Sequence, residues 1–319
     1  MFRQTALTAL LSATPLAAFA DVPVVVTDIG PVHSLVSMVM GDLGEPGLIL
    51  PPGANPHSYS MRPSEASVLE QADLVFWVGD ALSPWLVAPL GTLAGGAEQV
   101  ALMEAAGTEV LPFRFGGEDH DESAEDGEHD HDHDHDHEAH DEAEGADEHH
   151  DHGAYDPHVW LLPANALTWL DLIAAQLSDL DPDNAETYQT NAQAARDRLS
   201  ALFAELSDTL APIQSVDLVL YHDATQYFEK GFGLHAAGTM TVGDSAPSPR
   251  SLKELAGRVA ELDQACIVME PHVSPGLARA AGADVPYVVV DLQGAEYPTG
   301  PDFYVELMRG IATDLEGCL

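Results

Sequence analysis

Apolar residues along the first part of the chain form short runs that alternate with helical repeats. The runs contain mainly residues that favour buried strands, and they are Val22–Thr27, Gly47–Leu50 and Leu74–Val78. Between them, one helical pattern ends near Gly41 and another covers Ser64–Gln71. Strands that alternate with helices predict a parallel sheet with helices on both faces.

A long helix is predicted in the middle of the chain, after a shorter one at Ala164–Leu180. Asp183–Ala211 contains no glycine or proline, and Pro182 and Pro212 flank it as start and stop signals. Its apolar residues recur every three or four positions: Tyr188, Ala192, Ala195, Leu199, Leu202, Leu206 and Leu210. At 1.5 Å per residue the helix is about 40 Å long, so it can join two lobes.

The alternation resumes in the last third. Predicted strands are Val216–Tyr221, Cys266–Met269 and Tyr287–Val290, and predicted helices are Ser251–Leu262 and Asp302–Leu315. We therefore predict an α/β protein of two lobes, each a mainly parallel sheet flanked by helices, joined by one long rigid helix. The expected boundaries are 1–20 for a signal peptide, 21–181 for the N-terminal lobe, 182–212 for the linking helix and 213–319 for the C-terminal lobe.

The first twenty residues have the features of a secretory signal. Arg3 precedes the apolar run Ala6–Leu11, and Ala18, Phe19 and Ala20 predict cleavage before Asp21. No cysteine lies near that point, and no later run approaches the roughly 18 apolar residues of a membrane helix. We expect an exported protein without membrane insertion.

The net charge of -42 argues against nucleic acid and anionic lipid as partners. Eighteen acidic residues and ten histidines fall in 118–152, which contains no lysine or arginine. Imidazole and carboxylate bind divalent transition metals but cannot form an apolar core. We predict a disordered loop that binds or senses zinc weakly, and the alternative is a merely solvated insertion. Its candidate ligands are His129, His131, His133, His135, His137 and His140.

The chain contains two cysteines, Cys266 and Cys318. In an exported protein, an even pair without CxxC spacing predicts one disulfide. The alternative is two separate buried thiols.

Outside 118–152 there are six histidines, and several polar residues directly follow predicted strands. His222, Glu270 and Asp291 occupy such positions, and His57 follows a Pro-Pro-Gly turn after another strand. His158 lies where the chain returns from the acidic segment. Ligands of open α/β sheets bind beyond the carboxyl ends of the strands, so these side chains can meet at one cleft.

Three imidazoles and a carboxylate suit tetrahedral zinc. Each histidine has a structural alternative, and we expect His33 and His235, the latter in a glycine-flanked loop, to be structural. Glu270 is predicted as a hydrogen-bonding partner, and His272 as either a partner or an alternate ligand.

Motifs along the mature chain resemble the zinc-specific solute-binding proteins of bacterial ABC importers, the ZnuA type. The motifs that carry the resemblance are Pro51–Ser64, Ala72–Gly79, Asp156–Trp160, Asp181–Asn184 with Tyr188, His222–Ala224 with Tyr227–Glu229, Glu270–Pro271, Asp291 and Cys318–Leu319. The position of the His-rich insert also fits that family.

The resemblance implies a monomeric periplasmic protein that captures Zn²⁺ between its lobes and delivers it to a membrane permease. His57, His158 and His222 match the three metal-binding histidines of the family. Asp291 matches a carboxylate near the metal, but Leu292 follows it where a proline is expected, so His272 or water are alternatives for the fourth position. An imidazole at His222 favours zinc over manganese.

Two other classes share part of this chemistry. A zinc hydrolase also uses three histidines with an open fourth position, but the sequence has no HExxH and marks out no base except Glu270. A free-standing metal buffer or adhesin would need no permease. We expect a binding protein rather than an enzyme.

Overall fold

The computed structural model describes residues 22–114, 155–241 and 247–319, which form two four-stranded sheets. Every strand pair within them is parallel. The strand orders are β2-β1-β3-β4 and β6-β5-β7-β8, so each sheet has its first strand between its second and third. The predicted α/β class with two parallel sheets is confirmed. The predicted signal peptide and the insert 118–152 lie outside the described residues.

The N-terminal sheet is covered by helices on both faces. Its strands are β1 (Val25–Thr27), β2 (Gly47–Leu48), β3 (Leu74–Trp77) and β4 (Glu98–Ala101). Its outer face packs on α2 (Pro63–Glu70) and α3 (Val87–Leu93), and its inner face packs on α1 (Gly30–Met40). Alternate residues of a strand point to opposite faces, so Val25 lies inside and Val26 outside.

The C-terminal sheet repeats this arrangement. Its strands are β5 (Asp217–Leu220), β6 (His235–Thr239), β7 (Ala265–Met269) and β8 (Tyr287–Val289). The outer face packs on α7 (Pro249–Val259) and α8 (Pro275–Ala281), and the inner face on α6 (Gln226–Phe232) and α9 (Phe303–Glu316).

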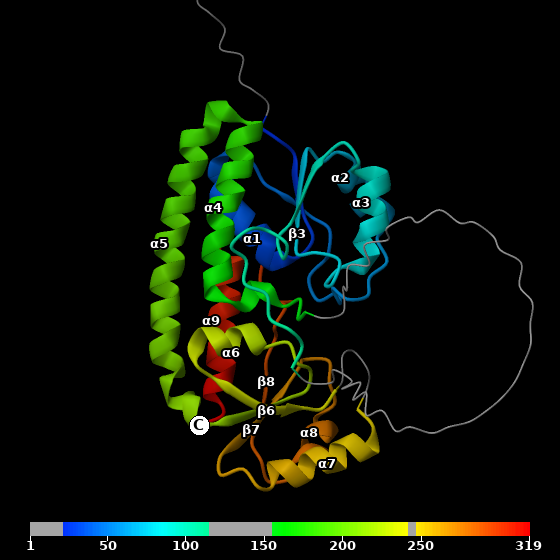
Figure 1. The fold of residues 1–319 in the computed structure, drawn as a ribbon, viewed down its shortest axis with the longest axis vertical. Helices are drawn as coiled ribbons and strands as arrows, with labels where there is room; N and C mark the ends of the chain where they lie inside the picture. The colour runs from blue at the N-terminus through cyan, green and yellow to red at the C-terminus, as the bar shows by residue number, and fades with distance from the viewer. Residues whose placement is uncertain (1–21, 115–154, 242–246) are drawn as a thin grey trace, which may run out of the picture.

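The inner faces of both sheets share one layer of helices. It is completed by α4 (Pro163–Leu180) and α5 (Ala185–Leu210), and α5 runs alongside both sheets in Figure 1. The seven apolar residues predicted to line α5 are all buried. The apolar cluster that they join includes residues of β3 and β7, so one core is continuous across both halves. The boundaries at 181 and 212 stay predictions.

The long helix is not the sole connection between the halves. The C-terminal helix α9 packs against both α1 and α5. At its start the backbone N–H of Tyr304 donates to Ser34 Oγ of α1 (3.0 Å), and its buried phenol donates to the carbonyl of Trp160 (2.7 Å). The halves are therefore joined through α9 as well.

The two cysteines form a disulfide between β7 and the last turn after α9. Both are buried, and 52 positions separate them. The predicted pairing is present, and the alternative of two separate thiols is wrong. Among the described residues no helix combines the length and the apolar character that crossing a bilayer requires.

Candidate metal centre

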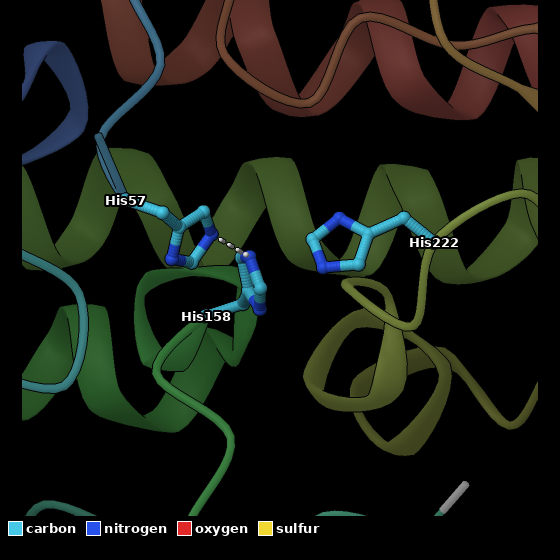
Figure 2. A group of neighbouring side chains, drawn as sticks. All are labelled: His57, His158 and His222. Carbon is cyan, nitrogen blue, oxygen red and sulfur yellow. Dashed lines mark hydrogen bonds between the residues drawn. The ribbon is translucent and has the colours of Figure 1, made fainter. Parts of the chain in front are cut away.

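Three histidines from separate parts of the chain converge between the two sheets. His57 lies on the loop after β2, His158 begins the short 3-10 helix Val159–Leu161, and His222 follows β5. Figure 2 shows the three imidazoles facing one another. Each ring offers a nitrogen that lies within 4.8 Å of the others, and this is the one such group of potential ligands found in the described parts of the chain.

The spacing of these rings suits a single small ion. His57 Nε2 lies 3.3 Å from His158 Nε2. Two nitrogens bound to one tetrahedral zinc at about 2.05 Å are about 3.3 Å apart. The nitrogen of His222 lies at most 4.8 Å from its partners, so a shift on the order of 1.5 Å completes the triangle. The described geometry is therefore close to a coordination shell.

His158 is the most firmly held of the three. It is buried, and Asp156 Oδ1 accepts both its backbone N–H (2.9 Å) and a hydrogen bond from its Nδ1 (2.7 Å). An ionised carboxylate can only accept, so in a neutral ring that donates from Nδ1 to Asp156 the lone pair is on Nε2, the atom that lies 3.3 Å from His57 Nε2. Asp156 is the first residue of the motif Asp156–Trp160, but the sequence alone assigned it no role. A carboxylate two residues before a candidate ligand was the available signal.

The loop that carries His57 is shaped by its turn and by two hydrogen bonds. Gly53 has φ +76°, a conformation that L side chains rarely adopt, and a Cβ there would lie 3.3 Å from Ala295. Asn55 Oδ1 accepts the backbone N–H of His57 (2.9 Å), and Trp85 Nε1 donates to the carbonyl of Pro56 (2.8 Å). The indole thereby fixes the residue immediately before His57.

His222 approaches from the C-terminal half and is paired with Glu270. Its Nδ1 lies 3.4 Å from Glu270 Oε1, and both side chains are about one-fifth exposed. Burial raises the pKa of Glu270, but the hydrogen bond and charge of His222, followed by the charges of His272 and His158, outweigh burial and leave the pKa lowered. Glu270 thus lies next to the imidazole of His222, and its role as a hydrogen-bonding partner of a metal ligand stays a prediction.

The three histidines line a cavity of about 470 Å³ that also contains Asp291 and His272. Asp291 is not part of the three-histidine group. Its carboxylate accepts backbone N–H groups of Gln293, Gly294 and Ala295 at 2.7–3.0 Å and so closes the turn after β8. His272 is three-quarters exposed and lies 3.5 Å from Glu270 Oε2. Their roles as ligands stay predictions.

The polar residues that follow the first strand of each sheet have different surroundings. The switch point of each sheet lies where its first strand ends, and in the C-terminal sheet His222 is there. In the N-terminal sheet Asp28 directly follows β1, whereas His222 comes two residues after β5. Asp28 is fully buried and accepts the backbone N–H groups of Ile29 (2.8 Å) and Val78 (2.9 Å). Burial raises the pKa of Asp28 to about 7, although these hydrogen bonds lower it. Asp28 therefore connects the residues that follow β1 and β3, and it is not part of the three-histidine group.

The remaining histidines separate into two groups. His33 is buried in α1 with Nε2 3.0 Å from the carbonyl of Pro46, as expected of a structural residue. His235 begins β6 rather than lying in a loop, and its Nδ1 is 3.1 Å from Asp217. The candidate ligands of the segment 118–152 lie outside the described residues. They are His129, His131, His133, His135, His137 and His140.

A charged cluster that sequence reasoning missed adjoins the site. Arg114 donates to Asp223 (2.8–3.3 Å) and to Glu229 (2.6 and 2.7 Å), and both carboxylates are buried. Burial would lower the pKa of Arg114, but the hydrogen bonds to Glu229 and Asp223 raise it. Burial raises the pKa of Asp223 despite Arg114. Arg114 is more than 100 positions from both carboxylates, so no local pattern signals its contact with them.

Comparison with known proteins agrees with the motif resemblance. The sequence model of the ZnuA family, described as zinc-uptake complex component A, periplasmic, matches residues 25–318. The chain belongs to the ZnuA family. Proteins called high-affinity zinc uptake system protein ZnuA are similar to it. The one from Paracoccus denitrificans is 40% identical over 317 residues, covering 98% of this chain and 97% of the relative. That of Brucella abortus is 39% identical over 304 residues, covering 92% and 91%.

Solved structures share the fold. FpvC of Pseudomonas aeruginosa in complex with Mn²⁺ has a TM-score of 0.72 and 22% identity, over 93% of this chain and 98% of that one. A crystal structure of ZnuA has a TM-score of 0.69 and 20% identity, over 93% and 100%. The family consists of transport binding proteins, so the chain is a binding protein rather than an enzyme.

Proposed function

We propose that the chain captures Zn²⁺ in the cleft between its halves through His57, His158 and His222, and delivers it to the permease of an ABC importer in the periplasm. The observation that carries this proposal is the convergence of three imidazole nitrogens within 4.8 Å. Nitrogen ligands in a nearly tetrahedral arrangement favour zinc over the oxygen-seeking ions magnesium, calcium and manganese. The names of the two relatives described above support zinc as the cargo.

Asp291 is the protein group best placed for the fourth position. It lines the same cavity, and Oδ2 accepts a single backbone hydrogen bond and so keeps a lone pair. To reach the ion, the turn after β8 has to move toward His222. If Asp291 does not reach the ion, His272 or water is the alternative for this position.

Delivery is tested by zinc uptake in bacteria that retain the permease but lack their own binding protein of this family. The chain should restore uptake of radioactive zinc. A variant with His57, His158 and His222 all changed to alanine should be exported in equal amount and restore none. Equal uptake with both proteins would refute delivery through this centre.

We also propose that the segment 118–152 is a secondary zinc-binding segment. Its support is composition, with ten histidines and eighteen acidic residues, and position, because His158 lies six residues beyond its end. Deleting 118–152 should reduce the zinc bound at saturation to one ion per chain and leave the affinity of that ion unchanged. The measurement is equilibrium dialysis with metal analysis, and an unchanged stoichiometry would contradict the proposal.

A further inference from the structure

The charged cluster of Arg114, Asp223 and Glu229 links two of the candidate zinc ligands. Arg114 precedes His158 in the chain, and it reaches across to the half of the molecule that carries His222. Its guanidinium donates from Nε and NH2 to Asp223 and from both terminal nitrogens to Glu229. A planar guanidinium with five donors can hold two carboxylates at once, and lysine cannot.

One end of this link is fixed within the C-terminal half. Glu229 Oε1 also accepts the hydroxyl of Thr225 (2.7 Å), and Oε2 accepts the backbone N–H of Ala236 in β6 (2.9 Å). Glu229 therefore offers Arg114 an immobile acceptor. Asp223 is the residue directly after His222, so the bonds from Arg114 to Asp223 restrain the backbone that carries this imidazole.

The other end is fixed to the segment that carries His158. Leu111 accepts the backbone N–H of Asp156 (2.9 Å), and its own N–H donates to the phenol of Tyr227 (2.7 Å). That phenol donates in turn to the carbonyl of Asp156 (2.8 Å). Asp156 holds the ring of His158, so the residues just before Arg114 share a buried hydrogen-bond network with that ligand.

We propose that Arg114 is a positioning residue of the zinc centre, holding His222 within coordination reach of His158 before the ion arrives. The inference rests on the proposed function, because it assigns these histidines to the ion. Arg114 itself does not touch the metal in this assignment. It acts through Asp223 on one side and through the segment 109–114 on the other.

A positioning role and a purely electrostatic role of Arg114 predict opposite changes in zinc affinity when this residue is replaced. Three buried carboxylates, Asp156, Asp223 and Glu229, lie around the site with this arginine among them. On charge alone, removing a cation near the site strengthens the attraction for Zn²⁺. Loss of positioning weakens binding, because part of the binding energy must then be used to order His222. The direction of the change therefore separates the two roles.

The test compares Arg114→Ala and Arg114→Lys with Arg309→Ala in the full chain. Arg309 forms a half-exposed ion pair with Glu205 between α9 and α5, so its loss changes the net charge equally without contacting the site. Zinc affinity is measured by competition with a chelator, and ligand geometry by the visible absorption of bound Co²⁺. We expect affinity at least tenfold weaker for Arg114→Ala, an intermediate loss for Arg114→Lys, altered Co²⁺ absorption in both, and less than a twofold change for Arg309→Ala.

Unchanged or tighter zinc binding by Arg114→Ala, with Co²⁺ absorption like that of wild type, overturns the proposal. If Arg114→Ala does not fold, as judged by thermal unfolding of the metal-free protein, Arg114→Lys decides in the same way. Failure of the proposed function looks different. In that case His158→Ala binds zinc as tightly as wild type, whatever the Arg114 variants do.

Discussion

Replacing His158 by alanine should weaken zinc binding by at least about a hundredfold, more than any substitution outside the three histidines. The ring is buried, is held by Asp156 and has Nε2 3.3 Å from His57 Nε2, so its loss removes the most firmly held of the three nitrogens. Changing residues that only orient a metal ligand costs about 10–100-fold, and loss of the ligand itself should cost more. The measurement is a zinc titration in competition with a chelator, using protein that lacks 118–152.

A graded series shows whether the loss arises at the metal. Asp156→Asn keeps the shape of the side chain but can present an amide donor to His158, and we expect it to weaken binding by about 10–100-fold.

Asp291→Ala should weaken binding if this carboxylate becomes the fourth ligand, and affinity equal to wild type would assign that position to water. Affinity within threefold of wild type for His158→Ala would refute the three-histidine centre.

Removing the disulfide should lower the free energy of unfolding by about 4 kcal/mol. The bond closes a loop whose ends are 52 positions apart, and the chain-entropy model gives this value for a loop of that length. Both cysteines are buried, so alanine at Cys266 and Cys318 leaves two small apolar residues in their place. The measurement is urea unfolding of the double variant and of wild type, without zinc in both cases.

Zinc affinity provides the matched control for this prediction. The disulfide ties the end of α9 to β7 and does not contact the three histidines, so affinity at low urea should stay within about threefold of wild type. A loss of stability below 1 kcal/mol would show that packing of α9 on α1 and α5, rather than the covalent link, holds the C-terminus.

The sequence predicted the convergence of the three histidines better than the packing of the helical layer. His222, Glu270 and Asp291 could be placed because each lies one or two residues after the end of a strand, and parallel strands direct their carboxyl ends to one edge. The predicted strand at Val216–Tyr221 lies at Asp217–Leu220, so the position of His222 was correct. Its precise neighbours depend on how two sheets face each other, which no local pattern specifies.

The missed elements are short or at sheet edges. β4 has the sequence Glu-Gln-Val-Ala with its first two residues exposed, and it becomes a strand through pairing with β3. β6 consists largely of small residues, and α8 has seven residues beginning Pro-Gly. Apolar periodicity is weak in such segments, and tertiary contacts determine their structure.

The predicted helix at Asp183–Ala211 illustrates what periodicity leaves open. Its apolar stripe was correct, and α5 covers Ala185–Leu210 after a 3-10 turn at Pro182–Asn184. The stripe shows that one face is buried but not what covers it. The structure packs that face into a core that also receives α1, α4 and α9, so α9 joins the halves in addition to the predicted helix.

The apolar core that both halves share limits how far the shape of the protein can change when it binds an ion. A wide clamshell swing would pull apolar side chains of α9 away from α1 and expose them to water, at about 25 cal/mol for each Å² uncovered. The ion-bound and ion-free forms should therefore have nearly the same overall shape. A membrane receptor that prefers the full form would have to sense small rearrangements at the mouth, where His57 and the turn of Asp291 meet.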